Sequence, residues 1–333
     1  MLPSYFPSRW LPGGHFQTLA TFRRQTLPTL RSTPHVVSLC DGDAIVLHED
    51  APVLDSAVRR SCGEDAVLLV HGLCGCHAAG YMIRVADRLR RQGLTVYRMD
   101  MRGCGAAADL AVNVMHAGRS ADCLAAMDHV ARRHSGKLGV AGFSMGGNQV
   151  LRMLGRLGSG DDPSPGWSTR LVAAVALAPP VDLARCSRFM LQGSRRVYSR
   201  YFLKQLLASI PRNVASRQDV AETLRNRRPK TLWDLDDRLT APLSGFVDAE
   251  DYYDRSSSMH VTGAIRIPTL LIAAADDPIV PVSCFRGPEA ITASGDVHLE
   301  LVPRGGHLGY VDRRWRCWAD EAIEAFFVRS LRP

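Results

Sequence analysis

The stretch Gly142-Phe143-Ser144-Met145-Gly146-Gly147 has the residue types and spacing for nucleophilic chemistry. A short apolar run, Lys137–Ala141, precedes it, and a run that favours a helix, Asn148–Leu154, follows it. Gly-x-Ser-x-Gly between a strand and a helix forms a sharp turn, which exposes the serine hydroxyl where helix N–H groups favour negative charge. The flanking glycines leave room for the crossing of strand and helix. We therefore predict that Ser144 is a nucleophile.

A serine hydroxyl is a weak nucleophile near neutral pH, so it needs a base, and a histidine oriented by a carboxylate serves best. In proteins with this kind of turn, the catalytic acid and then the histidine follow the serine along the chain. Asp276 and Asp277 follow the apolar run Leu270–Ala275, and His307 lies between glycines in Gly305-Gly306-His307-Leu308-Gly309. We predict His307 as the base and favour Asp277, the aspartate further into its loop, with Asp276 as the alternative.

The negative charge that develops on a carbonyl oxygen needs backbone N–H donors. One predicted donor is Met145, directly after the serine. The second is Leu73, in the loop His71-Gly72-Leu73-Cys74-Gly75, which follows the apolar run Val67–Val70. His71 is interpreted as a residue that shapes this turn.

The same loop also suggests a metal site, because Cys74, Cys76 and His77 lie close together in sequence and Cys104 falls in a later loop. Zinc sites usually use four ligands, often as Cys-x2-Cys pairs. Cys-x-Cys-His has a different spacing and no matching second pair. We predict neither a metal nor a cofactor.

The elements that must position these residues alternate between strand and helix. Short apolar runs indicate buried strands, and apolar residues three and four apart indicate helices. Such alternation gives right-handed βαβ units, so we predict an α/β fold with a mostly parallel central sheet and helices on both faces. The predicted elements are a hairpin over 36–48, strands 67–70, 94–99, 138–141, 171–177, 269–273 and 297–302, and helices 78–92, 119–134 and 315–331.

The pattern changes between two of these strands, where no strand signal occurs over a long stretch. That stretch is rich in Arg, Tyr, Phe and Leu, so we predict a helical lid inserted into the core. Phe189, Tyr201 and Phe202 are its predicted pocket residues. The predicted divisions are an N-terminal arm at 1–34, a core at 35–182 and 261–333, and the insertion at 183–260.

Composition narrows the function classes. The 333 residues carry a formal net charge of +8, but the basic residues are dispersed, which argues against a nucleic-acid partner and leaves contact with anionic lipid surfaces open. The 9 cysteines are scattered and odd in number, which favours reduced thiols. With neither a leader-like N-terminus nor an apolar run of membrane-spanning length, the expected location is cytoplasmic.

Several blocks of this sequence are similar to one family. The chain resembles the YheT-like hydrolases of the α/β-hydrolase superfamily, over nearly its whole length. In that family the triad falls on Ser144, Asp277 and His307. One departure is Cys76-His77, where small or hydroxyl residues usually stand. The blocks are Trp10–Leu19, His71-Gly72-Leu73-x-Gly75, Arg102-Gly103-Cys104, Gly142–Asn148, Ala178-Pro179-Pro180, Asp236–Pro242 and Gly245–Tyr253.

The resemblance implies an α/β-hydrolase fold and esterase or lipase activity. The leading hypothesis is a serine hydrolase that cleaves short- to medium-chain acyl esters or lipids through an acyl-enzyme. The second hypothesis is an acyltransferase that passes the acyl group to an alcohol. The third is a member of the fold that binds a ligand without catalysis. The expected partner is a small-molecule ester or lipid, and the oligomeric state stays open.

Overall fold

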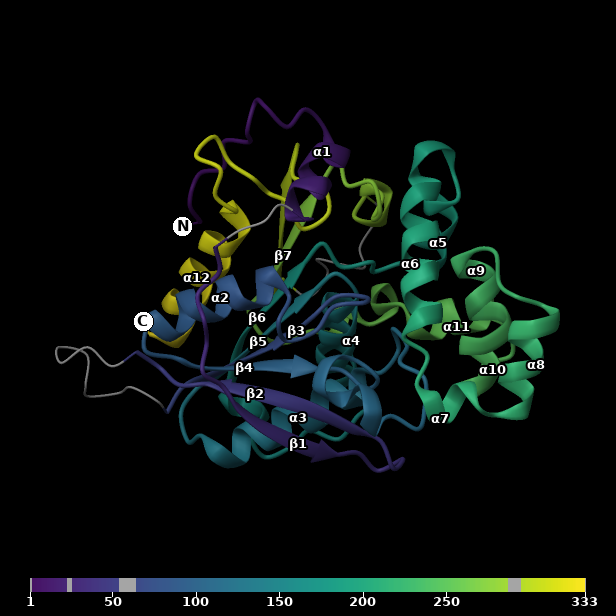
Figure 1. The fold of residues 1–333 in the computed structure, drawn as a ribbon. Coiled ribbons are helices and arrows are strands. Elements are labelled where there is room, and N and C mark those ends of the chain that lie inside the picture. Colours follow the sequence, from purple (N-terminus) through teal and green to yellow (C-terminus); the bar gives the residue numbers. More distant parts are fainter. Residues whose placement is uncertain (1, 23–25, 54–63, 287–294, 333) are drawn as a thin grey trace.

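The computed structural model describes residues 2–22, 26–53, 64–286 and 295–332. Its centre is a sheet in which neighbouring strands follow the order β1-β2-β4-β3-β5-β6-β7-β8 (Figure 1). All neighbours pair in parallel except β2, which is antiparallel to both β1 and β4. The strands are β1 Thr33–Ser38, β2 Ala44–Asp50, β3 Ala66–Val70, β4 Thr95–Asp100, β5 Leu138–Phe143, β6 Leu171–Leu177, β7 Thr269–Ala274 and β8 Val297–Val302.

Helices cover both faces of this sheet, as predicted. The strands β3 and β5 are buried along their whole length, which explains why their sequences are continuously apolar rather than alternating. Helices α2 and α12 pack on one face, and α3 and α4 on the other (Figure 1). These helices are α2 Gly80–Arg91, α3 Ser120–Arg133, α4 Met145–Ser159 and α12 Trp318–Leu331.

The chain between β6 and β7 is helical, and Figure 1 shows it in green at the right of the sheet. Its first part could form one long helix but forms two, of which the first ends at Met190 and the second begins at Arg196. Gly193 has a φ of 52°, which favours glycine and breaks the helix there. The helices are α5 Leu183–Met190, α6 Arg196–Ala208, α7 Arg212–Ala215, α8 Gln218–Asn226, α9 Leu232–Leu235, α10 Ala241–Leu243 and α11 Ala249–Ser256, with a π-helical turn at Asp236–Thr240 between α9 and α10.

The N-terminal arm contributes a short helix, α1 Gly14–Leu19. Its packing requires glycine at one point, because a Cβ at Gly14 would lie 1.7 Å from the backbone oxygen of Asp276. The arm therefore rests directly on the loop after β7. Among the helices of the described residues, none has the length and apolar character needed to cross a bilayer.

Candidate active site

Ser144 occupies a strained turn between β5 and α4. Its φ is 52° and its ψ is −120°, a conformation that side chains other than glycine rarely adopt. The crossing is so close that a Cβ at Gly142 would lie 2.3 Å from the Gly146 oxygen, and one at Gly146 would lie 2.4 Å from the His71 oxygen. The two glycines therefore allow the turn that holds Ser144 at the N-terminus of α4.

A chain of hydrogen bonds joins the three predicted triad residues. His307 Nε2 lies 2.8 Å from Ser144 Oγ, and His307 Nδ1 lies 2.8 Å from Asp277 Oδ2. All three residues are buried. The other carboxylate oxygen of Asp277 accepts backbone N–H bonds from Ile279 and Val280. These bonds fix the carboxylate, which in turn orients the imidazole toward the serine.

The neighbouring aspartate has different partners. Asp276 Oδ1 accepts N–H bonds from Gly305, at 2.8 Å, and from Gly306, at 2.9 Å. It therefore shapes the loop that carries His307, whereas Asp277 contacts the imidazole itself. Of the two aspartates left open by the sequence, the structure brings Asp277 to the histidine.

The N-terminal arm supports the histidine loop, a role that the sequence analysis missed. Thr18 Oγ1 donates a hydrogen bond to Gly14 O and accepts one of 2.8 Å from the backbone N–H of His307. The side chain of Gln17 bonds in both directions with the backbone of Val311, just beyond that loop. The only available signal was the Trp10–Leu19 block, because contacts across nearly the whole chain leave no trace in local spacing.

The loop that carries the predicted donor Leu73 lies against the serine. A Cβ at Gly72 would be 3.1 Å from Ser144 Cβ, and Leu73 and Met145 both line the pocket at Ser144. His71 is buried, which lowers its pKa, and Nδ1–H of the neutral ring donates to the Gly72 oxygen. Its Nε2 accepts from the Met101 N–H. His71 thus holds the turn, in keeping with its expected structural role.

A pocket of about 1230 Å³, its open mouth included, extends from Ser144 beneath the helical insertion. Phe202 lines it, but Phe189 and Tyr201 are absent from its lining. Tyr201 is 41% exposed, and Phe189 packs under the Arg195 guanidinium. Helix phase explains the difference between Tyr201 and Phe202, because adjacent residues of α6 project about 100° apart. Further apolar lining residues are Leu183, Met190, Leu206, Leu235, Leu239 and Leu243.

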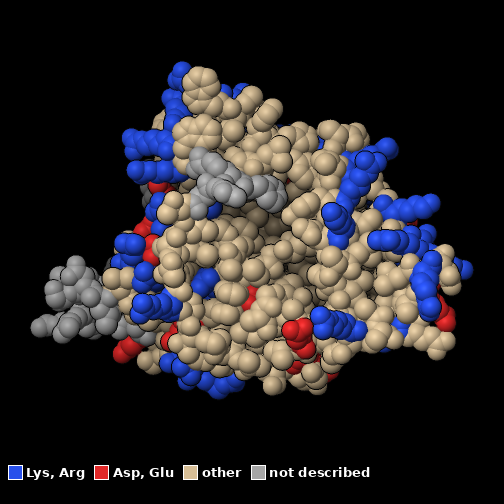
Figure 2. Space-filling view, viewed as in Figure 1, with Lys and Arg blue, Asp and Glu red and all other residues tan. Residues whose placement is uncertain are grey.

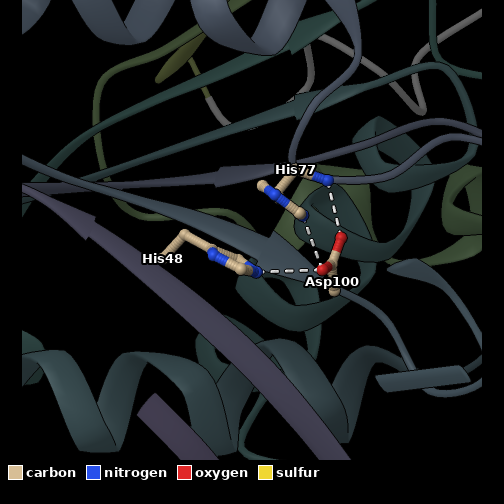
Figure 3. A group of neighbouring side chains, drawn as sticks. All are labelled: His48, His77 and Asp100. Carbon is tan, nitrogen blue, oxygen red and sulfur yellow. Dashed lines mark hydrogen bonds and ion pairs between the residues drawn. The ribbon is translucent and has the colours of Figure 1, made fainter. Parts of the chain in front are cut away.

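His77, which the sequence placed beside two cysteines, instead pairs with His48 and Asp100 (Figure 3). Its ring Nδ1 lies 2.7 Å from Asp100 Oδ2, and His48 Nε2 lies 3.0 Å from the same oxygen. The backbone N–H groups of His77 and Ala106 also donate to this carboxylate. Burial raises the pKa of Asp100, but these hydrogen bonds outweigh it and bring that pKa down to about 2.

Among the described residues, His48, His77 and Asp100 are also the group with metal-ligand spacing. Their geometry is that of a hydrogen-bonded cluster, however. The two imidazoles stack face to face at 3.5 Å, with only 14° between their planes. A ring nitrogen binds a metal in the plane of its ring, and nearly parallel planes do not converge on one ion between them. The cluster instead ties the loop after β3 to β2 and β4.

Comparisons with known proteins agree with this architecture. A model of the alpha/beta hydrolase fold family matches residues 65–313. The YheT protein of Escherichia coli is 28% identical over 317 residues, covering 92% of this chain and 87% of that protein. The family resemblance predicted from the sequence is thereby confirmed.

Two further comparisons extend this result. Medium-chain fatty acid ethyl ester synthase/esterase 2 of Saccharomyces cerevisiae is 29% identical over 293 residues, covering 79% of this chain and 62% of that protein. The solved structure of the Pyrococcus furiosus esterase Pf2001 superimposes with a TM-score of 0.57 at 15% identity, covering 99% of both chains. The structural match establishes the common fold.

Proposed function

This chain belongs to the α/β-hydrolase fold family, and we propose that it hydrolyses carboxylic esters through Ser144, His307 and Asp277. The observation that carries the proposal is the hydrogen-bond chain Ser144–His307–Asp277, in which both bonds are 2.8 Å. A non-catalytic, ligand-binding role would not require a base within bonding distance of a strained, pocket-facing serine. Names of relatives point the same way, since the yeast protein is called an esterase and the Pyrococcus structure is that of an esterase.

In the proposed reaction, Ser144 Oγ attacks the ester carbonyl carbon while His307 Nε2 accepts the hydroxyl proton. Asp277 holds the imidazole and stabilises its positive charge. The N–H groups of Leu73 and Met145 would donate to the carbonyl oxygen as it becomes negative. His307 then gives its proton to the departing alcohol, which leaves an acyl-enzyme. Water then attacks the acyl-enzyme while His307 accepts its proton, and His307 returns that proton to Ser144 Oγ as the carboxylic acid departs.

The helical segment 183–260 is proposed as a lid over the acyl chain, set between the core segments 35–182 and 261–333, with the arm at 1–34 bracing the histidine loop. Its support is the lining of the pocket, to which α5, α6 and the chain around α9 contribute. An apolar pocket that begins at the serine suits an acyl chain, since each buried methylene contributes about 0.8 kcal/mol. Short- to medium-chain esters or lipids are the proposed substrates.

Acyl transfer to an alcohol is the second candidate, because the name of the yeast relative records both ester synthesis and hydrolysis. In that case an alcohol would replace water in the second half of the reaction. The two activities separate when one ester is held constant and the alcohol concentration is varied. A product ester that rises at the expense of free acid identifies the transferase.

Contact with anionic lipid surfaces is proposed for the face drawn in Figure 2. That face is hollowed near its centre, and Lys and Arg side chains occupy its margins. On the arm, Trp10 is 73% and Phe16 is 55% exposed. Co-sedimentation with anionic vesicles, compared with neutral ones, tests this contact, and equal binding to both would contradict it.

The central test compares the native protein with Ser144→Ala, using p-nitrophenyl esters and a fluorophosphonate probe that labels activated serines. We expect Ser144→Ala to lose labelling and to lose at least about 10³-fold in kcat, as triad members do. Ser209→Ala is the matched control, because Ser209 also lines the pocket but its hydroxyl donates to the backbone oxygen of Leu206 rather than to a histidine. Retention of most activity in Ser144→Ala would contradict the proposal.

A further inference from the structure

A small polar cluster interrupts the apolar wall of the pocket. Ser187, from α5, Tyr253, from α11, and Asp236, from the π-helical turn, all line the pocket. Tyr253 donates a hydrogen bond of 2.6 Å to Asp236 Oδ2, and Ser187 Oγ lies 3.1 Å from the Tyr253 hydroxyl. We call these three residues the hydroxyl site.

The direction of these hydrogen bonds decides what the cluster can bind. A phenol has one proton, and Tyr253 gives it to Asp236. The bond between Ser187 and Tyr253 must therefore use the serine proton, which leaves Ser187 Oγ with acceptor capacity only. An ionised Asp236 is also an acceptor only. A ligand group that meets this cluster must therefore be a hydrogen-bond donor.

The negative charge of the Asp236 carboxylate has no ion-pair partner among the described residues. The ion pairs formed around it by the described residues join other side chains, such as Arg188 to Glu250 and Arg238 to Asp234. Burial raises the pKa of Asp236 to about 6, against the hydrogen bonds from Tyr253 and Thr240 that lower it. At neutral pH the group is therefore mostly an anion in an apolar pocket. Such a placement is costly unless the anion is hydrogen-bonded, and a donor from the substrate would supply a further bond.

We propose that Ser187, Tyr253 and Asp236 recognise a hydroxyl group on the acyl chain, so that the preferred substrates are esters of hydroxylated fatty acids. This inference rests on the proposed ester hydrolysis at Ser144. A hydroxyl suits the cluster better than an ammonium group, because a cation would lose far more hydration on entering the pocket. The acyl part is assigned because the apolar pocket suits the chain, whereas the alcohol part must leave toward solvent.

The alternative is that the cluster only ties helices together, since Tyr253 joins α11 both to α5 and to the π-helical turn. The two readings differ in one measurable quantity. A structural tie affects stability and all esters alike. A hydroxyl site affects the ratio of kcat/KM for a hydroxylated ester to that for its unsubstituted counterpart.

The experiment measures this ratio for p-nitrophenyl octanoate and its hydroxylated forms, with the hydroxyl near the ester, in mid-chain and at the chain end. For the best position we expect the native enzyme to prefer the hydroxyester by about 10-fold or more, as expected for a hydrogen bond to a charged group. In Asp236→Asn and Tyr253→Phe the ratio should fall toward one. Tyr252→Phe is the matched control, because that hydroxyl bonds the Ala117 N–H instead, so its ratio should stay high.

Three outcomes would overturn the inference. One is a native ratio near or below one at every hydroxyl position, and another is an unchanged ratio in both folded variants. The third is a stronger preference for the glycerol monoester of octanoic acid, with its hydroxyls on the alcohol part, or for p-nitrophenyl 8-aminooctanoate, both measured alongside. If Asp236→Asn does not fold, Ser187→Ala and Tyr253→Phe carry the same test. Absence of hydrolysis even of plain octanoate would instead contradict the proposed function.

Discussion

The hydroxyl of Thr18 accepts a 2.8 Å hydrogen bond from the backbone N–H of His307, 289 residues further along the chain. The same hydroxyl donates to Gly14 O, so the start of the chain and the histidine loop are joined through one oxygen. A Cβ at Gly306 would lie 2.4 Å from Gly14 O and 2.7 Å from Thr18 Oγ1. The position of the imidazole therefore depends on the N-terminal arm as well as on the loop that bears it.

Thr18→Val is predicted to lower kcat by about 10- to 100-fold with little change in KM. Valine keeps the shape of threonine but leaves the His307 N–H unsatisfied, and small displacements of catalytic groups cost up to about 10²-fold. Steady-state kinetics on a p-nitrophenyl ester measures the effect. Thr21→Val is the control, because the Thr21 hydroxyl donates to the backbone oxygen of Thr18 and not to the histidine loop. Equal losses in both variants would mean that the arm acts only through general stability.

Asp277→Asn is predicted to lose about 10⁴-fold in kcat, the order of loss known when asparagine imposes the wrong histidine tautomer. Asp276→Asn should lose far less, because an amide oxygen can still accept from Gly305 and Gly306. Its main effect should be a lower melting temperature. Circular dichroism of both variants separates unfolding from loss of chemistry. A larger kinetic loss in Asp276→Asn would reverse the assignment of the acid.

Asp100 is predicted to make stability depend on pH below about pH 4. Its folded pKa of about 2 lies below its ordinary value of 3.8. The carboxylate therefore stabilises the fold above about pH 4, and this contribution, about 2 kcal/mol, is lost as pH falls toward 2. Urea unfolding of the native protein and Asp100→Asn at several pH values measures it.

The difference in unfolding free energy between these two proteins should be largest above pH 4 and shrink toward pH 2. Glu250→Gln is a control from the surface of α11, where the carboxylate pairs with Arg188. Exposed pairs of that kind contribute only about 0.2–1 kcal/mol. A difference for Asp100→Asn that is independent of pH would show that the carboxylate is not held in its ionised form by the His48–His77 cluster.

Local chemistry explains which parts of the site were predictable from sequence. The turn at Ser144 needs glycine on both sides and a strand and helix around it, so residues that are consecutive in the sequence determine its geometry. His307 likewise stands out by its glycines and its position after the last strand. The support from Thr18 and the contact of His77 with His48 and Asp100 join distant segments. Such contacts depend on tertiary packing, which spacing along the chain does not encode.

The helical insertion shows a second feature that the sequence does not predict, which is the direction of individual side chains. Its helical character was predictable from composition and periodicity, but the division into separate helices and the direction in which each side chain points were not. A single helix such as α6 has several apolar positions, and only packing against the core decides which of them faces the pocket. Phe202 faces it and Tyr201 does not, although both are aromatic neighbours.

This difference between neighbours gives a matched pair for testing the proposed lid. Phe202→Ala is predicted to shift the preferred acyl chain toward longer esters, because removing the ring enlarges the pocket that Phe202 lines. Room for each extra methylene is worth about 0.8 kcal/mol, or roughly fourfold in kcat/KM. Tyr201→Ala, whose side chain lies outside the pocket lining, should leave the chain-length profile unchanged. The measurement is kcat/KM for p-nitrophenyl butyrate, octanoate and laurate. A lower melting temperature with the native profile in Phe202→Ala would show that α6 packs on the core without selecting the acyl chain.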